Sequence, residues 1–396
     1  MFRTIDSFNV RGKRVLVRAD LNVPAADGVV TDTTRIERSA ATLIDLARRG
    51  ARVILVSHFG RPKAADPAFS LKLLVEPLSQ ALGQPVRWVD DCIGRATQRA
   101  VASLRDGEVA LLENLRFYPG EEANDPAFAR ELAALADLYV DDAFSCSHRA
   151  HASIEAVAHL LPSAAGRLMQ AELEALGKAL EKPEKPVAAI VGGSKISTKL
   201  DLLGNLVAKV DYLIIGGGMA NTFLFAEGKP VGASLCERDL ADTARAILEK
   251  ARAAQCHVVL PVDVVVADKL APGAETEVVG IDAVPEGKMI LDAGPASAET
   301  IIDRLGGCNT LVWNGPLGAF EVAPFDAATN AVARWVAERT GQGRLLSVAG
   351  GGDTVSALDK AGVVDQLSYV STAGGAFLEW LEGKTLPGVA ALGGAA

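Results

Sequence analysis

Several features that mark other classes of protein are scarce or missing in this chain of 396 residues. The cysteines form no CxxC pair and show no metal-ligand spacing, which argues against a disulfide framework and a zinc site. The longest apolar stretch, VVLPVDVVVA, is interrupted by Pro261 and Asp263, and the first residues contain no apolar signal core. We therefore expect a cytoplasmic protein with five free thiols: Cys92, Cys146, Cys236, Cys256 and Cys308.

Positive charge is also in deficit, because 40 Lys and Arg residues face 49 Asp and Glu residues, for a formal net charge of −9. This balance argues against general binding to nucleic acid or to an anionic membrane, although a local basic cleft could still capture an acidic metabolite. The hydrophobic fraction of 49% is typical of a soluble globular protein, and the length favours two domains.

Two common nucleotide-binding motifs are missing as well. The pattern GxxxxGK[ST] cannot be laid over VGGSKISTKL at residues 191–200, so this is not a Walker A loop. Neither GGGMAN nor GGGDTV completes the GxGxxG fingerprint, which counts against an NAD enzyme.

What the chain does contain is a repeated alternation of strand-like and helix-like segments. Runs such as RVLVRADL, ARVILVSHFG, PVAAIVGG, HVVLPVDVVVAD, MILDAG and TLVWNGPLG are typical of buried strands. RIERSAATLIDLARRG, DPAFARELAALA and DLADTARAILEKARAA have helical periodicity. The alternation predicts an α/β fold with mainly parallel sheets covered on both faces, in which ligands bind beyond the carboxyl ends of the strands.

A boundary is predicted near the middle of the chain. AGRLMQAELEALGKALEKPEKP indicates a charged helix followed by a Pro/Lys/Glu linker. We expect an N-terminal domain at residues 1–166, the helix and linker at 167–184, and a second α/β domain at 185–371.

A pair of lysines stands where positive charge is unfavourable. Lys195 and Lys199 follow a glycine-rich turn at the expected start of a helix, where the helix dipole disfavours each cation by roughly 0.3–1 kcal/mol. Four residues apart, they would also share a helix face and repel each other by about 0.2–0.5 kcal/mol. A bound phosphate would reverse these terms, and the alternative is that both side chains extend into water.

Polar and basic residues follow the expected strands of the first half. Because the planar fork of arginine matches carboxylate and phosphate oxygens, several arginines at separate strand ends indicate a small, multiply charged anion. A lone Arg or His is more often structural, and we interpret Arg18, inside a strand, as structural. The anion-binding set comprises Asp20, Asn22, Arg35, His58, Arg61, Arg116, His148, Arg149 and His151.

The second half is rich in glycine at the corresponding places. GGSK at 192–195, GGG at 216–218, WNGPLGAFE at 313–321 and AGGGDT at 349–354 each follow an expected strand. Such glycines let backbone N–H groups approach a polyphosphate, and Asp353 would suit a hydrated Mg²⁺ carried with it. The alternative for any single glycine run is that it only makes a turn.

The first half of the chain is suited to a small anion, and the second half is suited to a polyphosphate. Together they indicate phosphoryl transfer in a cleft that closes to exclude water. Two other readings stay open. A nicotinamide-dependent dehydrogenase would need a complete glycine fingerprint and an acidic residue about 20 positions on. A two-lobed anion-binding protein without catalysis would normally have an export signal and no second, nucleotide-like site.

Six motifs, in order and spread over nearly the whole chain, closely resemble phosphoglycerate kinase: VRADLNVP, SHFGRP, ENLRFY, GGSKISTKL, WNGPLGAFE and GGGDT. The resemblance implies two Rossmann-like three-layer α/β domains joined by a helix and hinge, with residues 372–396 returning to the N-terminal domain. It also implies a monomer that transfers the acyl phosphate of 1,3-bisphosphoglycerate to Mg-ADP, reversibly, giving 3-phosphoglycerate and Mg-ATP.

The resemblance also implies residue roles. Triose binding falls on Asp20, Asn22, Arg35, His58, Arg61, Arg116 and Arg149. Nucleotide binding falls on Lys195, Lys199, Gly216, Gly217, Asn314, Pro316, Glu321, Gly351, Gly352, Asp353 and Thr354. Among these, Arg35 and Lys195 would stabilise the transferring phosphoryl group, and Asp353 would meet the Mg²⁺.

Three departures from the family pattern remove no charged group. The usual STGGGA reads STAGGA here, so Ala373 replaces a glycine in the expected hinge, SHLGRP reads SHFGRP, and the small-residue stretch before HRAH reads FSCS.

Overall fold

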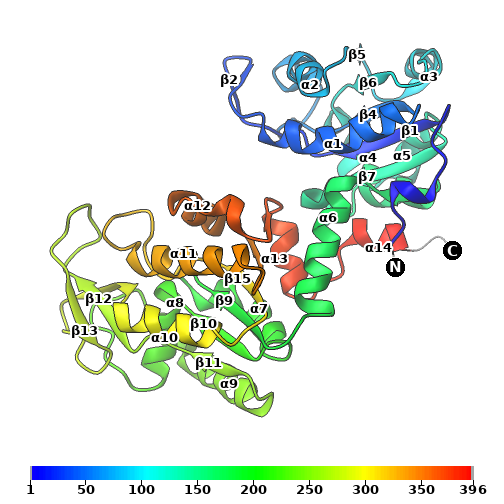
Figure 1. Cartoon of the computed structure of the whole chain (residues 1–396). Coiled ribbons are helices and arrows are strands. Elements are labelled where there is room, and N and C mark those ends of the chain that lie inside the picture. Colours follow the sequence, from blue (N-terminus) through cyan, green and yellow to red (C-terminus); the bar gives the residue numbers. More distant parts are fainter. Residues whose placement is uncertain (1, 394–396) are drawn as a thin grey trace. The chain divides into compact units, whose positions relative to one another are not determined.

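The computed structural model of the protein describes residues 2–393, and the contacts within it group the chain into two units (Figure 1). Unit 1 comprises Met1–Leu173 and Thr385–Ala396, and unit 2 comprises Glu174–Lys384. The domain limits expected from the sequence, including the return of residues 372–396 to the N-terminal domain, stay a prediction.

Unit 1 is built on a six-stranded sheet with the order β5-β6-β4-β1-β7-β8, in which every pairing is parallel. The strands are β1 (Arg14–Ala19), β4 (Arg52–Val56), β5 (Val86–Val89), β6 (Val109–Leu112), β7 (Leu138–Asp142) and β8 (Ser163–Ala165). After β1 the chain builds the sheet on one side through β4, β5 and β6, and then crosses to β7 on the other side. The strand order therefore reverses between β1 and β7, which is where such sheets bind ligands.

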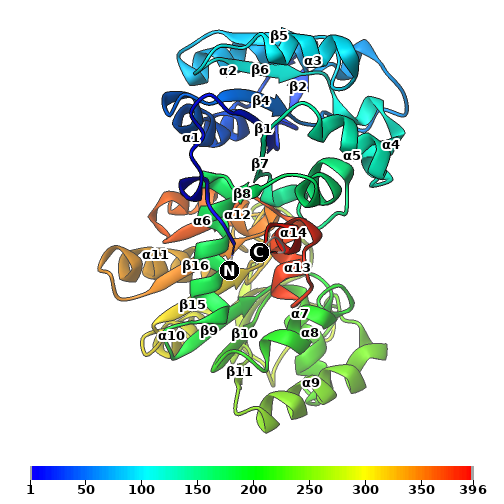
Figure 2. The same ribbon diagram turned by 90° about the vertical axis from the view of Figure 1, so that its right-hand side faces the viewer.

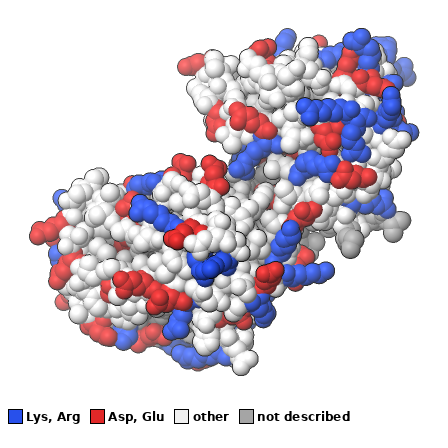
Figure 3. Space-filling model, in the orientation of Figure 1, with Lys and Arg blue, Asp and Glu red and all other residues white. Residues whose placement is uncertain are grey.

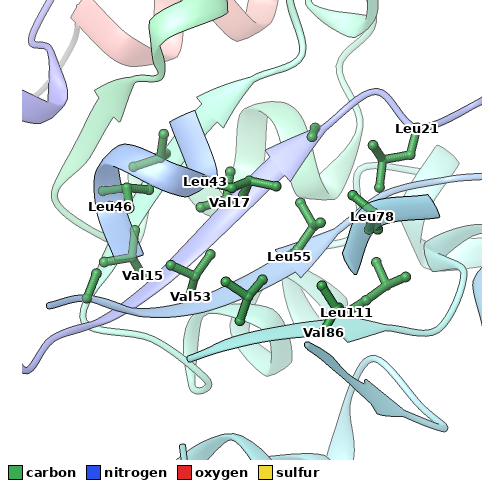
Figure 4. Packing of buried hydrophobic residues seen from close by; sticks show 14 of the residues in the cluster. Val15, Val17, Leu21, Leu43, Leu46, Val53, Leu55, Leu78, Val86 and Leu111 are labelled. Carbon is green, nitrogen blue, oxygen red and sulfur yellow. The ribbon is translucent and has the colours of Figure 1, made fainter. Parts of the chain in front are cut away.

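Helices cover both faces of this sheet because successive residues of each strand point to opposite faces. Val15 and Val17 of β1 pack with Leu43 of α1 and Leu78 of α2 on one face (Figure 4). Leu16, between the two valines, packs on the other face with residues of α3 and α5. The helices of unit 1 are α1 (Thr34–Arg48), α2 (Val75–Leu82), α3 (Gly94–Ala102), α4 (Pro119–Glu122), α5 (Pro126–Ala133) and α14 (Pro387–Gly393).

Short elements complete unit 1. A two-stranded antiparallel hairpin joins β2 (Ala25–Ala26) and β3 (Val29–Val30). Helical turns lie at η1 (Ile5–Ser7), η2 (Pro67–Phe69), η3 (Leu71–Leu74), η4 (Leu115–Phe117), η5 (Phe144–Cys146), η6 (Ala152–Ala156) and η7 (Val157–His159).

The predicted charged helix in the middle of the chain is present as α6 (Arg167–Leu176), which continues into a π-helical turn, η8 (Gly177–Glu181). Arg167 is tied at its start to Asp6 and Asp45, each at 2.6 Å.

Unit 2 contains a second six-stranded parallel sheet with the order β11-β10-β9-β15-β16-β17. The strands are β9 (Val187–Val191), β10 (Tyr212–Ile215), β11 (His257–Val259), β15 (Thr310–Asn314), β16 (Leu346–Gly350) and β17 (Tyr369–Ser371). In chain order this is the 3-2-1-4-5-6 arrangement of doubly wound folds, and the order reverses between β9 and β15.

The sheet of unit 2 is also covered on both sides, with α10 and α11 on one side and α8 and α9 on the other (Figure 2). Ile190, Leu311 and Trp313 pack on the first side with Ile301 of α10 and Val332 of α11. The helices are α7 (Leu200–Leu206), α8 (Gly217–Ala226), α9 (Ala241–Ala253), α10 (Pro295–Leu305), α11 (Ala327–Gly341), α12 (Gly352–Lys360) and α13 (Gly375–Leu381), with turns η9 (Ile196–Thr198), η10 (Arg238–Leu240) and η11 (Val364–Gln366).

One strand prediction is wrong. HVVLPVDVVVAD does not form a single buried strand, because only β11 belongs to the parallel sheet. Its second part is β12 (Asp263–Ala267), which pairs antiparallel with β13 (Glu277–Gly280) and with β14 (Met289–Ala293), the predicted MILDAG strand. Pro261 separates the two parts, since proline has no N–H group to donate to a sheet.

Acidic and basic side chains are interspersed on the face of each unit that Figure 3 shows. No helix in residues 2–393 combines the length and the apolar composition needed to cross a membrane.

Candidate active site

The anion-binding set of unit 1 lies at the carboxyl ends of four adjacent strands. Asp20 and Asn22 follow β1, His58 and Arg61 follow β4, Arg116 lies in η4 after β6, and Arg149 lies in the segment after β7. Because these strands are parallel neighbours in the order β6-β4-β1-β7, their ends share one edge of the sheet. Arg35 reaches the same edge from the first turn of α1.

Asp20 is held by three partners at this edge. Its Oδ2 accepts hydrogen bonds from Arg35 Nη1 at 2.7 Å and from Ser145 Oγ at 2.5 Å, and its Oδ1 accepts from the backbone N–H of Asn22 at 3.1 Å. Burial opposes ionisation of this carboxyl, but the Arg35 guanidinium and the Ser145 hydroxyl hold the pKa of Asp20 below its usual value. Asp20 is therefore an ionised carboxylate, and its ion pair with Arg35 orients the guanidinium.

Gly60 joins two further members of the set. Its N–H donates to Asn22 Oδ1 at 2.9 Å, and its carbonyl accepts from Arg116 Nη1 at 2.6 Å. The backbone of Gly60 is left-handed, with φ of +63°, and a Cβ there would lie 2.3 Å from the ring of Phe69. Only glycine fits this turn, which sequence reasoning did not single out.

Two histidines of the set, His58 and His151, are neutral at physiological pH. Burial, followed by repulsion from Arg18, lowers the pKa of His58 well below its usual value. Burial also lowers the pKa of His151 to about 4, with Arg18, Arg116 and Arg149 contributing in the same direction. Burial and the neighbouring arginines thus both disfavour further positive charge here, and an added anion would relieve the repulsion among the arginines.

Arg61 and Arg149, in contrast, are exposed at this edge. Their guanidinium groups are therefore open to a ligand from solvent.

Cys146 also belongs to this edge, although the cysteine spacing gave no sign of it. The ligand atoms of Asp20, His58 and Cys146 lie within 4.8 Å of one another, a separation that could hold a metal ion. However, Arg18 Nη2 lies 3.0 Å from His58 Nδ1 and 3.8 Å from Cys146 Sγ. The guanidinium takes the place that a cation would need.

Lys195 and Lys199 do not share a helix face, so the prediction that they lie four residues apart on one helix is wrong. A 3₁₀ turn, η9, separates them, and α7 begins only at Leu200. Lys195 is exposed before the turn. Lys199 is partly buried after it, and its Nζ donates to Asn314 Oδ1. Burial lowers the pKa of Lys199, and the nearby carboxylates of Asp353 and Glu382 oppose that change.

Asn314 connects three strand ends at the carboxyl edge of unit 2. Its carbonyl accepts from Gly192 N at 2.9 Å, and its Nδ2 donates to the carbonyl of Gly350 at 2.8 Å, so it bridges the ends of β9, β15 and β16. Next to it, Gly315 N donates to Thr354 Oγ1 at 2.7 Å. Thr354 lies in the first turn of α12, after Gly351, which has a φ of +99°, and the exposed Gly352 and Asp353.

Glycines allow the backbones of these loops to touch. A Cβ on Gly192 would lie 1.9 Å from the carbonyl oxygen of Pro316, and one on Gly217, at a φ of +67°, would lie 2.7 Å from the carbonyl oxygen of Gly193. A Cβ on Gly216 would lie 2.6 Å from Leu317 Cδ2. The predicted glycines therefore do more than turn the chain, because they bring the ends of β9, β10 and β15 together.

A cavity of about 400 Å³ opens among these loops. Predicted residues that line it are Gly217, Pro316, Glu321 and Asp353. Apolar side chains that line it, which sequence reasoning missed, include Leu235, Leu291, Leu317 and Phe320. A mostly apolar cavity beside a lysine-bearing turn and a helix start suits a flat ring joined to a phosphate chain.

Sequence reasoning also missed two acidic residues, Glu237 and Asp292. Glu237 holds the turn between the lysines, since its carboxylate accepts from Ser197 N at 3.0 Å and from Ser197 Oγ at 2.6 Å. Asp292 lies in the cavity wall and accepts from Ala328 N at 3.0 Å, at the start of α11. Burial raises the pKa of Asp292 to about 7. Neither residue follows a glycine-rich motif, so the sequence offered no signal for them.

Comparison with known proteins agrees with this geometry. The sequence profile of the family described as phosphoglycerate kinase matches residues 5–384. Phosphoglycerate kinase of Rhodospirillum centenum is 62% identical over 393 residues, covering 99% of both chains. Phosphoglycerate kinase of Brucella abortus is 60% identical over 390 residues, covering 98% of both chains.

Solved structures agree in fold. The structure of phosphoglycerate kinase from Coxiella burnetii superposes with a TM-score of 0.94 at 44% identity, covering 99% of both chains. That of Pyrococcus horikoshii superposes with a TM-score of 0.81 at 30% identity, covering 99% of this chain and 98% of the other.

The chain belongs to the phosphoglycerate kinase family.

Phosphoglycerate kinases transfer a phosphoryl group between 1,3-bisphosphoglycerate and ADP to give 3-phosphoglycerate and ATP in glycolysis, and this is the activity of the chain. The fold prediction, two α/β domains with mainly parallel sheets, is confirmed. Membership in the phosphoglycerate kinase family also decides against the dehydrogenase and the non-catalytic anion-binding protein.

Proposed function

We propose that unit 1 binds the triose through Asp20, Asn22, Arg35, His58, Arg61, Arg116 and Arg149, and that unit 2 binds the nucleotide. The observation that carries the triose assignment is the convergence of cations at the carboxyl edge of unit 1. Burial first, and then the charges of Arg18, Arg116 and Arg149, lower the pKa of His151 to about 4, and a carboxylate or phosphate would relieve the repulsion. Arg61 and Arg149, the exposed members, would make first contact with the anion.

The nucleotide half of the proposal rests on the cavity of unit 2. The base would lie among the apolar side chains near Gly216 and Gly217, with Glu321 at the ribose hydroxyls. The phosphates would extend towards Lys195, Lys199 and the first turn of α12 at Gly351–Thr354, where N–H groups have no partner within the helix.

The donor set also fits a magnesium ion carried by the nucleotide. Asp353 is an exposed carboxylate in the cavity wall, and Mg²⁺ commonly binds one or two carboxylates together with substrate phosphates and water. When bound, the ion would neutralise charge on the phosphate oxygens of the substrate.

The proposed chemistry needs no general base. In the ATP-consuming direction the nucleophile is the carboxylate of 3-phosphoglycerate, which is ionised near neutral pH because carboxyl pKa values lie around 4. Catalysis then consists of positioning and charge stabilisation. Arg35, oriented by Asp20, would stabilise the transferring group from the triose side, and the exposed Lys195 would stabilise it from the nucleotide side.

Phosphoryl transfer requires the two substrates to come within bonding distance, and their proposed ligands belong to different units. We therefore propose that the units approach each other when both substrates are bound. We further propose that the protein acts as a monomer in the cytoplasm. A reducing location is supported by its five free cysteines, of which Cys92, Cys146, Cys256 and Cys308 are buried.

Calorimetric titration of paired variants tests the assignment of the two sites. Arg149→Ala should weaken binding of 3-phosphoglycerate by at least about ten-fold and leave Mg-ADP binding unchanged, because a charged hydrogen bond contributes about 1.5–3 kcal/mol. Lys199→Ala should show the reverse pattern. Unchanged Mg-ADP affinity in Lys199→Ala would remove that lysine from the site. A coupled assay with 3-phosphoglycerate and ATP measures the activity itself.

A further inference from the structure

Arg18 is a fully buried cation in the middle of the parallel sheet of unit 1. It lies in β1, two residues before Asp20, and only 1% of its surface is exposed. A buried guanidinium is costly unless it is paired and hydrogen-bonded, so its partners indicate its role. Nη1 donates to the carbonyl of Ala19, and Nε lies 2.9 Å from Ser153 Oγ. Nη2 lies 3.0 Å from His58 Nδ1 and 3.8 Å from Cys146 Sγ.

A second buried ionisable residue, Glu121, holds this guanidinium through Ser153, and burial raises the pKa of its carboxyl group. Glu121, with no exposed surface, accepts from Ser153 Oγ at 2.6 Å and from Ser153 N at 3.0 Å. The Ser153 hydroxyl thus donates to Glu121 and accepts from Arg18. This chain ties Arg18 to a carboxylate on α4 and fixes the direction of its remaining N–H groups.

The bond to His58 determines where the imidazole carries its proton. Arginine can only donate hydrogen bonds, so Nδ1 of His58 must accept. A neutral imidazole whose Nδ1 accepts carries its hydrogen on Nε2. In the other tautomer, or in the imidazolium, an N–H on Nδ1 would face the N–H of Arg18.

The surrounding charges act in the same direction. The groups that face His58 are Arg18 of β1, Asp20 after β1, Arg116 of η4, Cys146 of η5 and His151 before η6. Burial lowers the pKa of His58 most, Arg18 comes next, and only Asp20 opposes them. His58 is therefore neutral at physiological pH.

We propose that Arg18 is a positioning residue that fixes His58 as the Nε2–H tautomer, so that His58 offers the triose anion a neutral hydrogen-bond donor. This inference rests on the proposed triose site. Nε2 is the ring nitrogen left for a ligand, because His58 retains 6% exposure and Nε2 has no hydrogen-bond partner among residues 2–393. Because this Nε2–H group keeps its hydrogen at every pH near neutrality, binding of the substrate does not require His58 to change its protonation state.

Nitrogen NMR on the wild-type protein labelled with ¹⁵N-histidine tests the tautomer directly. The chain has five histidines, and His58→Gln identifies the signal of interest by its loss. We expect that signal to show a protonated Nε2 and an unprotonated Nδ1, with no titration between pH 5.5 and 8.5. An Nδ1–H tautomer, or protonation within that range, would overturn the inference.

Substitution of Arg18 tests whether this residue determines the tautomer of His58. Arg18→Met should let His58 populate the Nδ1–H tautomer as well, because no donor then faces Nδ1, and should raise KM for 3-phosphoglycerate by about ten-fold. Because this change leaves Glu121 buried without its cation, the double variant Arg18→Met/Glu121→Gln is the folded alternative. Arg14→Met is the matched control, since Arg14 lies in the same strand but pairs with Asp137.

The outcomes separate the two proposals. If His58 keeps only the Nε2–H tautomer in the Arg18 variants, Arg18 is only structural and the inference fails. If the wild-type protein shows the expected tautomer but KM in the Arg18 variants is unchanged, His58 does not donate to the triose and the inference fails as well. Failure of the wild-type protein to bind 3-phosphoglycerate would instead refute the proposed triose site.

Discussion

Removal of the Arg35 guanidinium is the sharpest test of the proposed mechanism. Arg35 Nη1 lies 2.7 Å from Asp20 Oδ2, with 39% of the arginine side chain and 11% of the aspartate side chain exposed. An ion pair this open to solvent contributes about 1 kcal/mol or less to folding. Asp20 also keeps its bonds from Ser145 and Asn22 when Arg35 is lost. Arg35→Met should therefore fold with almost wild-type stability.

The expected loss of turnover is far larger. Removing one donor that stabilises transition-state charge typically lowers kcat on the order of 10²–10³-fold, or about 3–4 kcal/mol. We expect that loss for Arg35→Met in a coupled assay that starts from 3-phosphoglycerate and ATP, with a smaller change in KM. Arg35→Met should thus raise the activation free energy of turnover by about 3 kcal/mol but lower the free energy of unfolding by only about 1 kcal/mol. This difference distinguishes a catalytic role of Arg35 from a role in folding.

A matched control is available in the same unit. Arg14 and Asp137 form an ion pair of the same length, 2.7 Å, with 31% and 36% of the two side chains exposed, so Asp137 is more open to solvent than Asp20. Arg14 is the first residue of β1, at the strand end opposite Asp20. Arg14→Met should match Arg35→Met in urea denaturation and keep its turnover. If Arg35→Met retains more than about a tenth of wild-type kcat while circular dichroism shows an intact fold, the assigned role of Arg35 is wrong.

Three further predictions follow from other parts of the structure. Gly192→Ala should lower stability by about 1–3 kcal/mol and weaken Mg-ADP binding, because its Cβ would lie 1.9 Å from the carbonyl oxygen of Pro316. Asp142 should destabilise the fold as pH rises, since burial raises its pKa to about 7, above the value of about 3.9 in an unfolded chain. Its contribution is fully present below about pH 4 and is lost towards pH 7, so the wild type should lose up to about 1.4 kcal/mol per pH unit relative to Asp142→Asn in this window. Finally, 3-phosphoglycerate and Mg-ADP together should reduce the radius of gyration in X-ray scattering more than either ligand alone.

Each of these has an outcome that contradicts it. For Gly192, urea denaturation and calorimetry should be compared with Gly341→Ala, whose Cβ would meet nothing within 4 Å, and equal results would refute the steric argument. For Asp142, parallel curves of unfolding free energy against pH in the wild type and the variant would show that the buried carboxyl has an ordinary pKa. Identical scattering with none, one and both ligands would contradict the approach of the units.

Much of the residue cluster that we propose as the triose site could be located from the sequence. Asp20, His58 and Arg116 each follow an apolar run that ends in a polar motif, and parallel strands bring their carboxyl ends to one edge. The same reasoning located Asn314 and the glycines of unit 2. The positions of these residues at the strand ends could be predicted because strand periodicity and chain direction are local properties.

The lysine pair shows where such reasoning fails. The spacing of Lys195 and Lys199 predicted one helix face, yet a 3₁₀ turn held by Glu237 separates them, and Asn314 binds Lys199 across 115 residues of sequence. No local pattern encodes partners so distant. Arg18 was interpreted as structural because it lies inside a strand, and only the fold brings it within 3.0 Å of His58.

The sequence by itself determined the order of strands and helices, the strand ends that carry charge, and the glycines that let backbones touch. These depend on side-chain periodicity and on the steric freedom of single residues. Tertiary structure alone decided which charges are buried, which hydrogen bonds orient Arg35, Lys199 and His58, and where the apolar cavity opens. Burial and hydrogen-bond geometry depend on segments more than 100 residues apart, such as Asp20 with Ser145, 125 residues away, and these meet only when the chain has folded.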